Sequence, residues 1–153
     1  DPGAGINKLA LCSAHQLLAA GTDGGYLHLW DARAGSGGGS GGKGVAAIDL
    51  RDSNKKNKKV TAVTFAEDGL SMAIGTSSAH CLTFDLRSSR PTFVKEHQYG
   101  LPVSNVKFHK GPERRVLSCD TKTVKIWGRD DGQVVTNVET PADINDLCIA
   151  QDA

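Results

Sequence analysis

The sequence predicts an all-β protein assembled from a unit of short strands that occurs three times. Each unit opens on an apolar run broken by polar residues, and the three runs begin at Ile6, Val60 and Val103. Each start is followed 24 residues later by an aromatic residue, which gives the positions Trp30, Phe84 and Trp127. A fourth unit begins at Ile144 and is cut off before its aromatic position. Repetition at a fixed interval indicates a repeat architecture.

Within each unit the apolar runs predict strands in a fixed order. The first strands are expected at residues 6–11, 60–65 and 103–108. Second strands are expected at residues 17–22, 72–76 and 116–120, and third strands at residues 27–30, 81–84 and 124–127. Outer strands are expected at residues 45–50 and 92–95. Turn sequences such as Asp23-Gly24-Gly25 separate the runs, as in hairpins, and no stretch keeps a helical period.

The spacing between the units indicates blades of a WD40-type β-propeller. The four starts are 54, 43 and 41 residues apart, and WD-repeat blades span about 40–45 residues. Trp30-Asp31 is the signature dipeptide, Phe84-Asp85 keeps its carboxylate, and Trp127-Gly128 loses it. Residues 1–153 therefore form one propeller fragment, with about three blades and the start of a fourth. Because a propeller closes with about 4–8 blades, we expect the chain to be part of a larger protein.

The repeated aromatic residues are expected to be structural. An aromatic side chain at the end of each third strand fills the space between neighbouring blades, which explains why it recurs at one offset. Gly21 and Gly75 are expected where strands pack closely or bulge.

Residues 34–44 interrupt the regular spacing with a Gly/Ser-rich stretch. Such a composition forms a flexible coil. Its 11 residues account for the excess of the first spacing over the second. We interpret it as a flexible insertion between strands, either natural or engineered.

Composition and motifs give little reason to expect a catalytic, metal-binding or membrane-bound protein. The net charge is +1 with 23% charged residues, so no global charge calls for nucleic acid or membrane. The four cysteines form no C-x-x-C pair, and the five histidines show no metal-ligand spacing. No apolar stretch approaches the about 18 residues of a membrane span, and the motifs of hydrolases, zinc proteases and P-loop proteins are absent. We expect a non-enzymatic protein with no cofactor, metal, membrane contact or small-molecule substrate.

Two loops are candidates for contacts with a partner. The first carries Lys55, Lys56, Lys58 and Lys59, a charge density that attracts phosphate or acidic surfaces, although a solvated loop would have the same composition. The second combines polar donors with an aromatic ring and turn residues in His97, Gln98, Tyr99, Gly100, Leu101 and Pro102. Loops are where propellers place recognition residues, but a rigid turn remains the alternative for the second loop.

Several longer runs resemble one known family. Residues 84–91, 94–103, 124–127 and 143–148 are closely similar to the nucleolar protein 10 family of WD-repeat proteins. The similarity continues, more weakly, through residues 20–22 and 29–33, and leaves out only the Gly/Ser insertion. It implies a protein of the nucleus and nucleolus that joins the small-subunit processome in pre-rRNA processing and 40S subunit biogenesis. Its expected partners are other ribosome-assembly proteins, with pre-rRNA as a further candidate, and its mechanism is scaffolding.

A shorter resemblance supports a competing interpretation. Trp30-Asp31-Ala32-Arg33 and Phe84-Asp85-Leu86-Arg87 resemble the W-D-x-R motif, by which some propellers serve as substrate receptors of a cullin-type ubiquitin ligase. Arg33 and Arg87 would then be the docking residues. A local turn ion pair explains the same spacing, and the longer resemblance is the more specific of the two.

Overall fold

The chain folds into three antiparallel sheets of four strands each, which confirms the predicted all-β propeller architecture. The structure is a computed structural model and describes residues 5–33 and 44–150. Blade 1 contains β1 (Ile6–Cys12), β2 (Leu17–Thr22), β3 (Tyr26–Asp31) and β4 (Gly44–Asp49), followed by the short 3-10 helix η1 (Leu50–Asp52). Blade 2 contains β5 (Val60–Phe65), β6 (Ser71–Thr76), β7 (His80–Asp85) and β8 (Pro91–Glu96). Blade 3 contains β9 (Asn105–Phe108), β10 (Arg115–Cys119), β11 (Thr123–Gly128) and β12 (Val134–Glu139).

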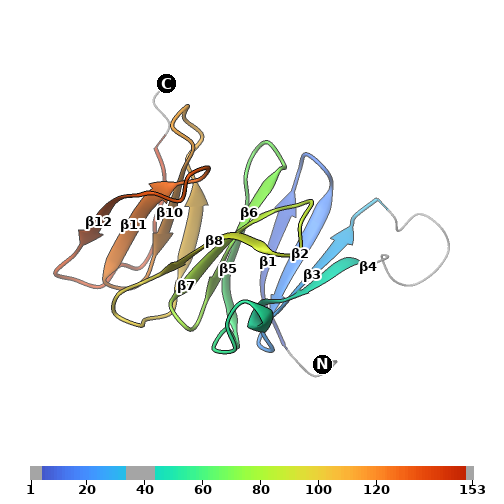
Figure 1. The fold of residues 1–153 in the computed structure, drawn as a ribbon, viewed down its shortest axis with the longest axis horizontal. Helices are drawn as coiled ribbons and strands as arrows, with labels where there is room; N and C mark the ends of the chain where they lie inside the picture. The colour runs from blue at the N-terminus through green and yellow to red at the C-terminus, as the bar shows by residue number, and fades with distance from the viewer. Residues whose placement is uncertain (1–4, 34–43, 151–153) are drawn as a thin grey trace.

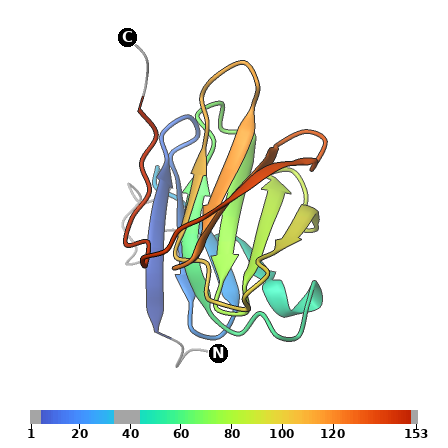
Figure 2. The same cartoon turned by 90° about the vertical axis from the view of Figure 1, so that its left-hand side faces the viewer.

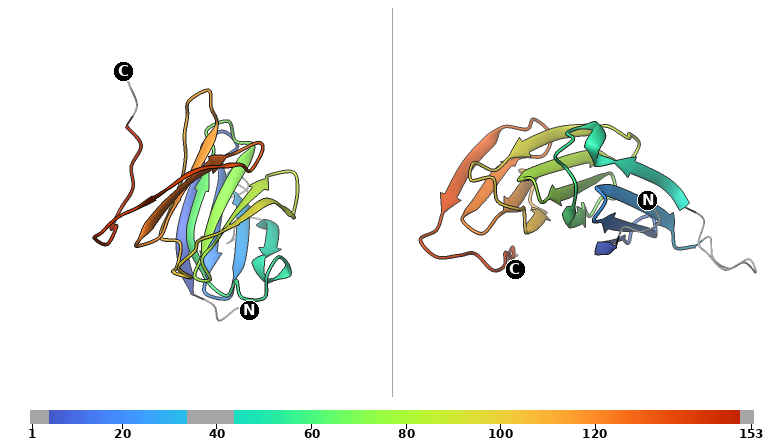
Figure 3. Two further views of the ribbon diagram at one scale, coloured as in Figure 1. Left: turned by 60° about the vertical axis from the view of Figure 1, so that its left-hand side comes forward. Right: turned by 90° about the horizontal axis from the view of Figure 1, so that it is seen from below.

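The blades stand side by side along an arc (Figure 3, right). Seen from the side of blade 3, the sheets lie one behind another (Figure 2). The first strands β1, β5 and β9 line the inside of this arc, where β5 contacts both β1 and β9. Within each sheet the strands pair in chain order, so the fourth strand lies at the outer edge. Consecutive hairpins explain this order, because each strand pairs with the one that follows it.

Two apolar seams join the blades. The seam between blades 1 and 2 buries Phe84 against Leu27 and Leu29. The seam between blades 2 and 3 buries Trp127 with Ala73 and Cys81. Both aromatic side chains are fully buried and face the preceding blade, and together they are the largest buried groups of the chain.

Trp30 occupies the same repeat position but is only half-buried. Its ring stacks on His28, with centroids 5.6 Å apart, and His28 stacks on Tyr26. The face of blade 1 that carries these rings has no preceding blade against it among the described residues. The packing role expected of Trp30 therefore needs a neighbouring blade, as Phe84 and Trp127 have.

The expected first strand of a fourth blade is not formed. Residues 140–150 contain no strand. Asn105 nevertheless donates a hydrogen bond to Asp146 over 2.6 Å, and Ile144 N–H donates to the carbonyl of Thr121 over 2.8 Å. The segment thus lies along β9, where the next first strand would belong. In the three blades a first strand pairs only with the second strand of its own blade, and within residues 5–33 and 44–150 no such strand is available to the backbone groups of this segment.

The Gly/Ser insertion at residues 34–44 lies outside the described residues except for Gly44, which begins β4. The outer strand expected at residues 45–50 corresponds to β4, and the one expected at residues 92–95 corresponds to β8.

Trp127→Ala should lower the free energy of unfolding of the intact protein by about 3–5 kcal/mol, the cost of removing a large buried aromatic side chain. The matched control is Val135→Ala on the exposed outer strand β12, where the side chain is 51% exposed and the change should stay within about 0.5 kcal/mol. Urea unfolding of both variants measures the difference. Equal midpoints for Trp127→Ala and the parent protein would contradict the assignment of Trp127 to the seam.

Candidate interaction surface

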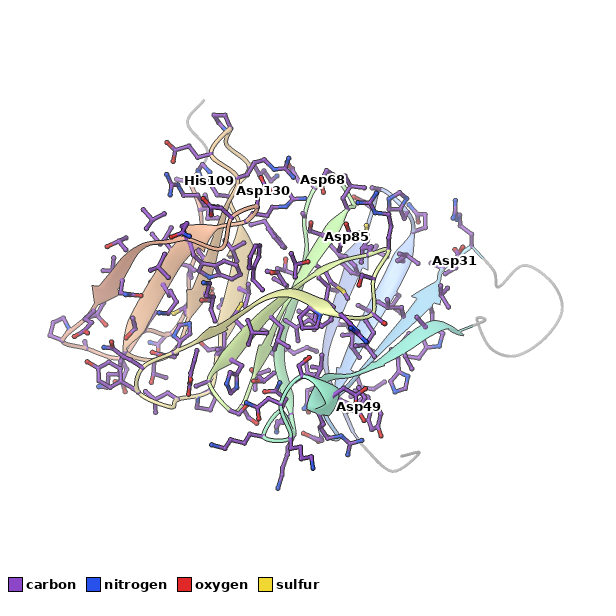
Figure 4. All side chains as sticks on the ribbon, viewed as in Figure 1. Asp31, Asp49, Asp68, Asp85, His109 and Asp130 are labelled. Atoms are coloured by element: carbon purple, nitrogen blue, oxygen red, sulfur yellow. The ribbon has the colours of Figure 1, made fainter. Side chains whose placement is uncertain are left out.

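The two loops singled out in the sequence connect fourth strands to the first strands that follow. Residues 50–59 connect β4 to β5, and residues 97–104 connect β8 to β9. Both lie at the edge of the blades where η1 is found, at the bottom of Figure 1, and we call it the lower edge. The turns after the third strands lie at the opposite, upper edge, where Asp31, Asp85 and Asp130 are labelled in Figure 4. The fold therefore brings both candidate loops to one edge of adjacent blades.

The lysine loop, residues 54–59, is fixed by one buried side chain. Asn57 is fully buried and donates from Nδ2 to the carbonyl of Leu50 over 3.2 Å. Its Oδ1 accepts hydrogen bonds from Ser78 Oγ at 2.6 Å and from Thr76 Oγ1 at 3.2 Å. Leu50 follows β4 of blade 1, whereas Thr76 ends β6 of blade 2 and Ser78 lies just after it. Asn57 thus attaches the loop to both blades.

The lysines flank this anchor and point to solvent. Lys55, Lys56, Lys58 and Lys59 are all exposed. Lys59 forms an ion pair with Asp23 over 3.1 Å, and hydrogen bonds from Asn7 and Lys59 hold the pKa of Asp23 below its ordinary value. Within the described residues, the ammonium groups of Lys55, Lys56 and Lys58 have no carboxylate partner. Three uncompensated positive charges on a fixed loop create a local positive potential, so this loop remains a candidate site for an anionic surface.

The second loop contains a correction to the sequence prediction, because His97 is 1% exposed and cannot contact a partner. Its Nδ1 lies 2.9 Å from Asp120 Oδ2, and its Nε2 lies 2.8 Å from Ser118 Oγ. Asp120 Oδ1 also accepts the backbone N–H groups of Lys122 and Thr123, both at 2.7 Å. A carboxylate acceptor requires the proton on Nδ1, so Ser118 donates to Nε2. His97 therefore holds the loop of blade 2 on the hairpin of blade 3.

The remaining residues of this loop stay at the surface. Tyr99 is 50% exposed, and Gln98, Gly100 and Pro102 are also exposed, while Leu101 is half-buried. Gln98 Nε2 donates to Glu139 Oε1 over 2.5 Å. Gly100 has a φ of 65°, which glycine adopts without strain. The candidate contact residues of this loop are therefore Gln98, Tyr99, Gly100, Leu101 and Pro102.

Ser118, His97 and Asp120 have the hydrogen-bond order of a hydrolase triad, but they are sealed inside the seam. Ser118 and Asp120 are both 0% exposed, and a nucleophile must reach a substrate to react. Their arrangement serves packing, and so does the nearby Cys81 thiol, whose pKa burial raises to about 12. Asn57, Ser118 and Asp120 were not singled out from the sequence, which marks Ser118 and Asp120 only as members of the strand predicted at residues 116–120.

Arg33 and Arg87, the candidate docking residues of the ligase interpretation, lie in turns at the upper edge. Arg33 Nε pairs with Asp31 over 3.2 Å, and Arg87 Nη2 pairs with Asp85 over 2.6 Å. The Arg87 hydrogen bond lowers the pKa of Asp85 to about 2. Both arginine side chains remain largely exposed. Each motif thus forms the local turn ion pair that the sequence offered as the simpler explanation.

In the described part of the chain, no three His, Cys, Asp or Glu side chains are grouped so that they could hold a metal ion. Among these residues there is also no helix with the length and apolar character needed to cross a membrane. The cysteines are free thiols, with Cys12, Cys81 and Cys119 buried and Cys148 exposed.

Fold and surface together define a propeller segment with two structured loops at one edge, and the comparisons identify its family. Residues 2–153 match the model of the Nucleolar protein 10-like, N-terminal domain, and the chain belongs to this family. It is 38% identical over 144 residues to Nucleolar protein 10 of Xenopus laevis, covering 94% of the chain and 21% of that protein. It is 35% identical over 151 residues to the Ribosome biogenesis protein enp2 homolog of Schizosaccharomyces pombe, covering 97% of the chain and 24% of that protein.

The chain therefore spans about a fifth to a quarter of the length of these two relatives. Among solved structures, a chain in the Crystal Structure of Mitotic Checkpoint Complex superimposes with a TM-score of 0.73 at 21% identity. The match covers 88% of this chain and 39% of that chain. At this level of identity the likeness concerns the fold alone.

The buried position of His97 makes stability depend on pH. Burial lowers the pKa of His97 against the opposing effect of Asp120, while Lys125 adds to the lowering. On acidification the unfolded chain takes up a proton near pH 6.5, whereas the folded protein keeps His97 neutral. The free energy of unfolding should therefore fall as the pH drops below about 6.5.

His97→Asn should be less stable than the parent protein at pH 7.5, with a difference that shrinks towards pH 5.5 because the variant has lost this titration. Urea unfolding at several pH values measures the difference, and His15→Asn, at an exposed histidine, is the matched control. A stability difference for His97→Asn that is constant across this range would contradict the assignment.

Proposed function

We propose that the protein containing this chain acts in the nucleolus as a non-enzymatic scaffold of the small-subunit processome, in pre-rRNA processing and 40S ribosomal subunit biogenesis. The observation that carries this proposal is membership, over residues 2–153, of the Nucleolar protein 10-like family. Relatives named Nucleolar protein 10 and Ribosome biogenesis protein enp2 homolog support the same role.

The lower edge supplies the physical means of such a role. A scaffold needs loops that hold their shape before a partner arrives, because ordering a loop on binding costs conformational entropy. Asn57 fixes the lysine loop and His97 fixes the second loop, each by buried hydrogen bonds to the following blade. The partners of this edge are then other ribosome-assembly proteins with acidic surfaces and, at the lysine loop, pre-rRNA phosphates.

The second loop contributes a different kind of contact. Tyr99 and Leu101 supply apolar surface beside the amide of Gln98, and the glycine and proline limit the conformations available to the loop. A tyrosine that is half-exposed on a fixed loop provides contact area at a low entropic cost. We assign this loop to protein contact rather than to phosphate contact, because residues 97–102 carry no basic side chain apart from the buried His97.

Replacing Lys55, Lys56, Lys58 and Lys59 together by Gln should weaken association of the full-length protein with small-subunit precursors. The difference between variant and parent should be largest at low salt, because salt screens the attraction that the lysines supply. Folding should be unaffected, since exposed loop substitutions usually stay within about 0.5 kcal/mol. Sedimentation of tagged protein with precursor particles at several salt concentrations measures the effect.

The matched control removes four exposed positive charges elsewhere, at Lys8, Arg90, Lys107 and Lys110. It should keep most of the association at every salt concentration. If the lysine-loop variant associates as well as the parent protein throughout, the lysines are only a solvated loop.

Purification of the tagged full-length protein separates the two functional interpretations, the processome scaffold and the ubiquitin-ligase receptor. Recovery of a ubiquitin-ligase adaptor, in place of pre-rRNA and processome proteins, would contradict the scaffold role.

A further inference from the structure

A small pocket opens at the upper edge, between blades 2 and 3, on the side away from both candidate loops. Its volume is about 230 Å³, and it is lined by residues of β6, β7 and β8 of blade 2 and by residues near β10 and β11 of blade 3. Asp85 and Asp130, which line it, lie at this edge in Figure 4. We call it the arginine pocket, because Arg87, Arg114 and Arg129 line it.

The three guanidinium groups are held in place by neighbouring oxygen atoms. Arg129 donates to Asp68 Oδ2 over 2.6 Å and to Ser71 Oγ over 2.9 Å, and its guanidinium lies 5.5 Å from the centre of the Phe108 ring. Arg114 pairs through Nε with Asp130 over 3.1 Å. These contacts, like those of Arg87 with Asp85, are made through Nε and Nη2. Each guanidinium has five N–H donors, so donors remain at Nη1 for a ligand.

Thr83 gives a second, independent indication of a ligand. Thr83 is among the pocket-lining residues and only 3% exposed, yet its Oγ1, like Thr123 Oγ1 and Trp127 Nε1, has no hydrogen-bond partner among the described residues. Buried hydroxyl groups are normally paired, and one left unpaired in a native structure calls for an explanation such as a bound group. Thr83 pairs across the sheet with Ala73 and Phe93, whose side chains belong to the seam and offer it no acceptor.

From these observations we infer that the arginine pocket binds a single acidic group of a protein partner, a carboxylate or a phosphorylated side chain. The remaining guanidinium N–H groups can donate charge-assisted hydrogen bonds to either group, and the Thr83 hydroxyl is a further donor. The carboxylates of Asp85 and Asp130 at the rim repel a polyanion, which disfavours a nucleic-acid strand. A lone acidic side chain brings only one charged group to this rim, so it meets less repulsion than a strand that carries a charge at every phosphate. The site is separate from the lysine loop and does not depend on it.

The test uses the full-length protein and two small probes, N-acetyl-glutamate methylamide and N-acetyl-phosphoserine methylamide. Saturation-transfer NMR should detect saturable binding of at least one, and the stronger signal distinguishes carboxylate from phosphoryl recognition. Arg87→Gln and Thr83→Val should each weaken binding by about tenfold, the effect of losing one hydrogen bond to a charged group. Arg90→Gln is the matched control, since Arg90 is exposed in the same turn but does not line the pocket.

Thr83→Val also separates binding from packing. Valine has nearly the shape of threonine, so it should keep the melting temperature unchanged or raise it, because it removes an unpaired buried hydroxyl. A lower melting temperature would show that the hydroxyl is satisfied within the fold and would overturn the inference. Equal binding by Thr83→Val and the parent protein would overturn it too, and so would tighter, Thr83-dependent binding of a uridine hexanucleotide.

Discussion

The structure depends on the close approach of each first strand to the second strand of the blade before it. A Cβ atom added at Gly75 would lie 2.7 Å from Val103 Cγ1, and one added at Gly21 would overlap Val60. Val60 and Val103 are the residues that open the second and third repeats, and both are fully buried. Because Gly21 and Gly75 place no side chain against these valines, the third strands of neighbouring blades come near enough for one aromatic ring to fill the gap. The common offset of 24 residues reflects these two contacts.

This constraint also determines how the loops at the lower edge are held. Asn57 precedes β5 and reaches Thr76 at the end of β6, while His97 precedes β9 and reaches Asp120 just after β10. Both side chains fix a loop to the following blade, but with different groups. Asn57 uses an amide with hydroxyl partners, whereas His97 uses an imidazole with a carboxylate and a hydroxyl. Each anchor is buried because the seam beside it is closed, so the exposed residues of both loops take their positions from the packing of the blades.

The sequence predicted strands well where each strand has its neighbours, and less well where a neighbour is missing. Alternating apolar runs and turn residues were enough to place β2, β6 and β8 within one residue or two. Residues 144–149 carry the same pattern but form no strand, because the described part of the chain offers them no second strand to pair with. Trp30 shares its offset with Phe84 and is only half-buried, because no blade of the described residues packs on its face. His97 looked like a surface residue, since the acceptor that buries it, Asp120, lies 23 residues away.

The two edges of the blades differ in how their charges are compensated, and this difference separates their expected ligands. At the lower edge, three lysines have no carboxylate partner among the described residues, so their field extends into solvent and attracts an extended anionic surface. At the upper edge, Asp68 accepts Arg129 and lies 3.7 Å from Arg114. Burial would raise the pKa of Asp68, but the Leu70 N–H and these two arginines hold it below its ordinary value. The carboxylates cancel the long-range field of those arginines, whose free N–H groups can act only on an anion in direct contact. A net charge of +1 is therefore compatible with two surfaces suited to different anions.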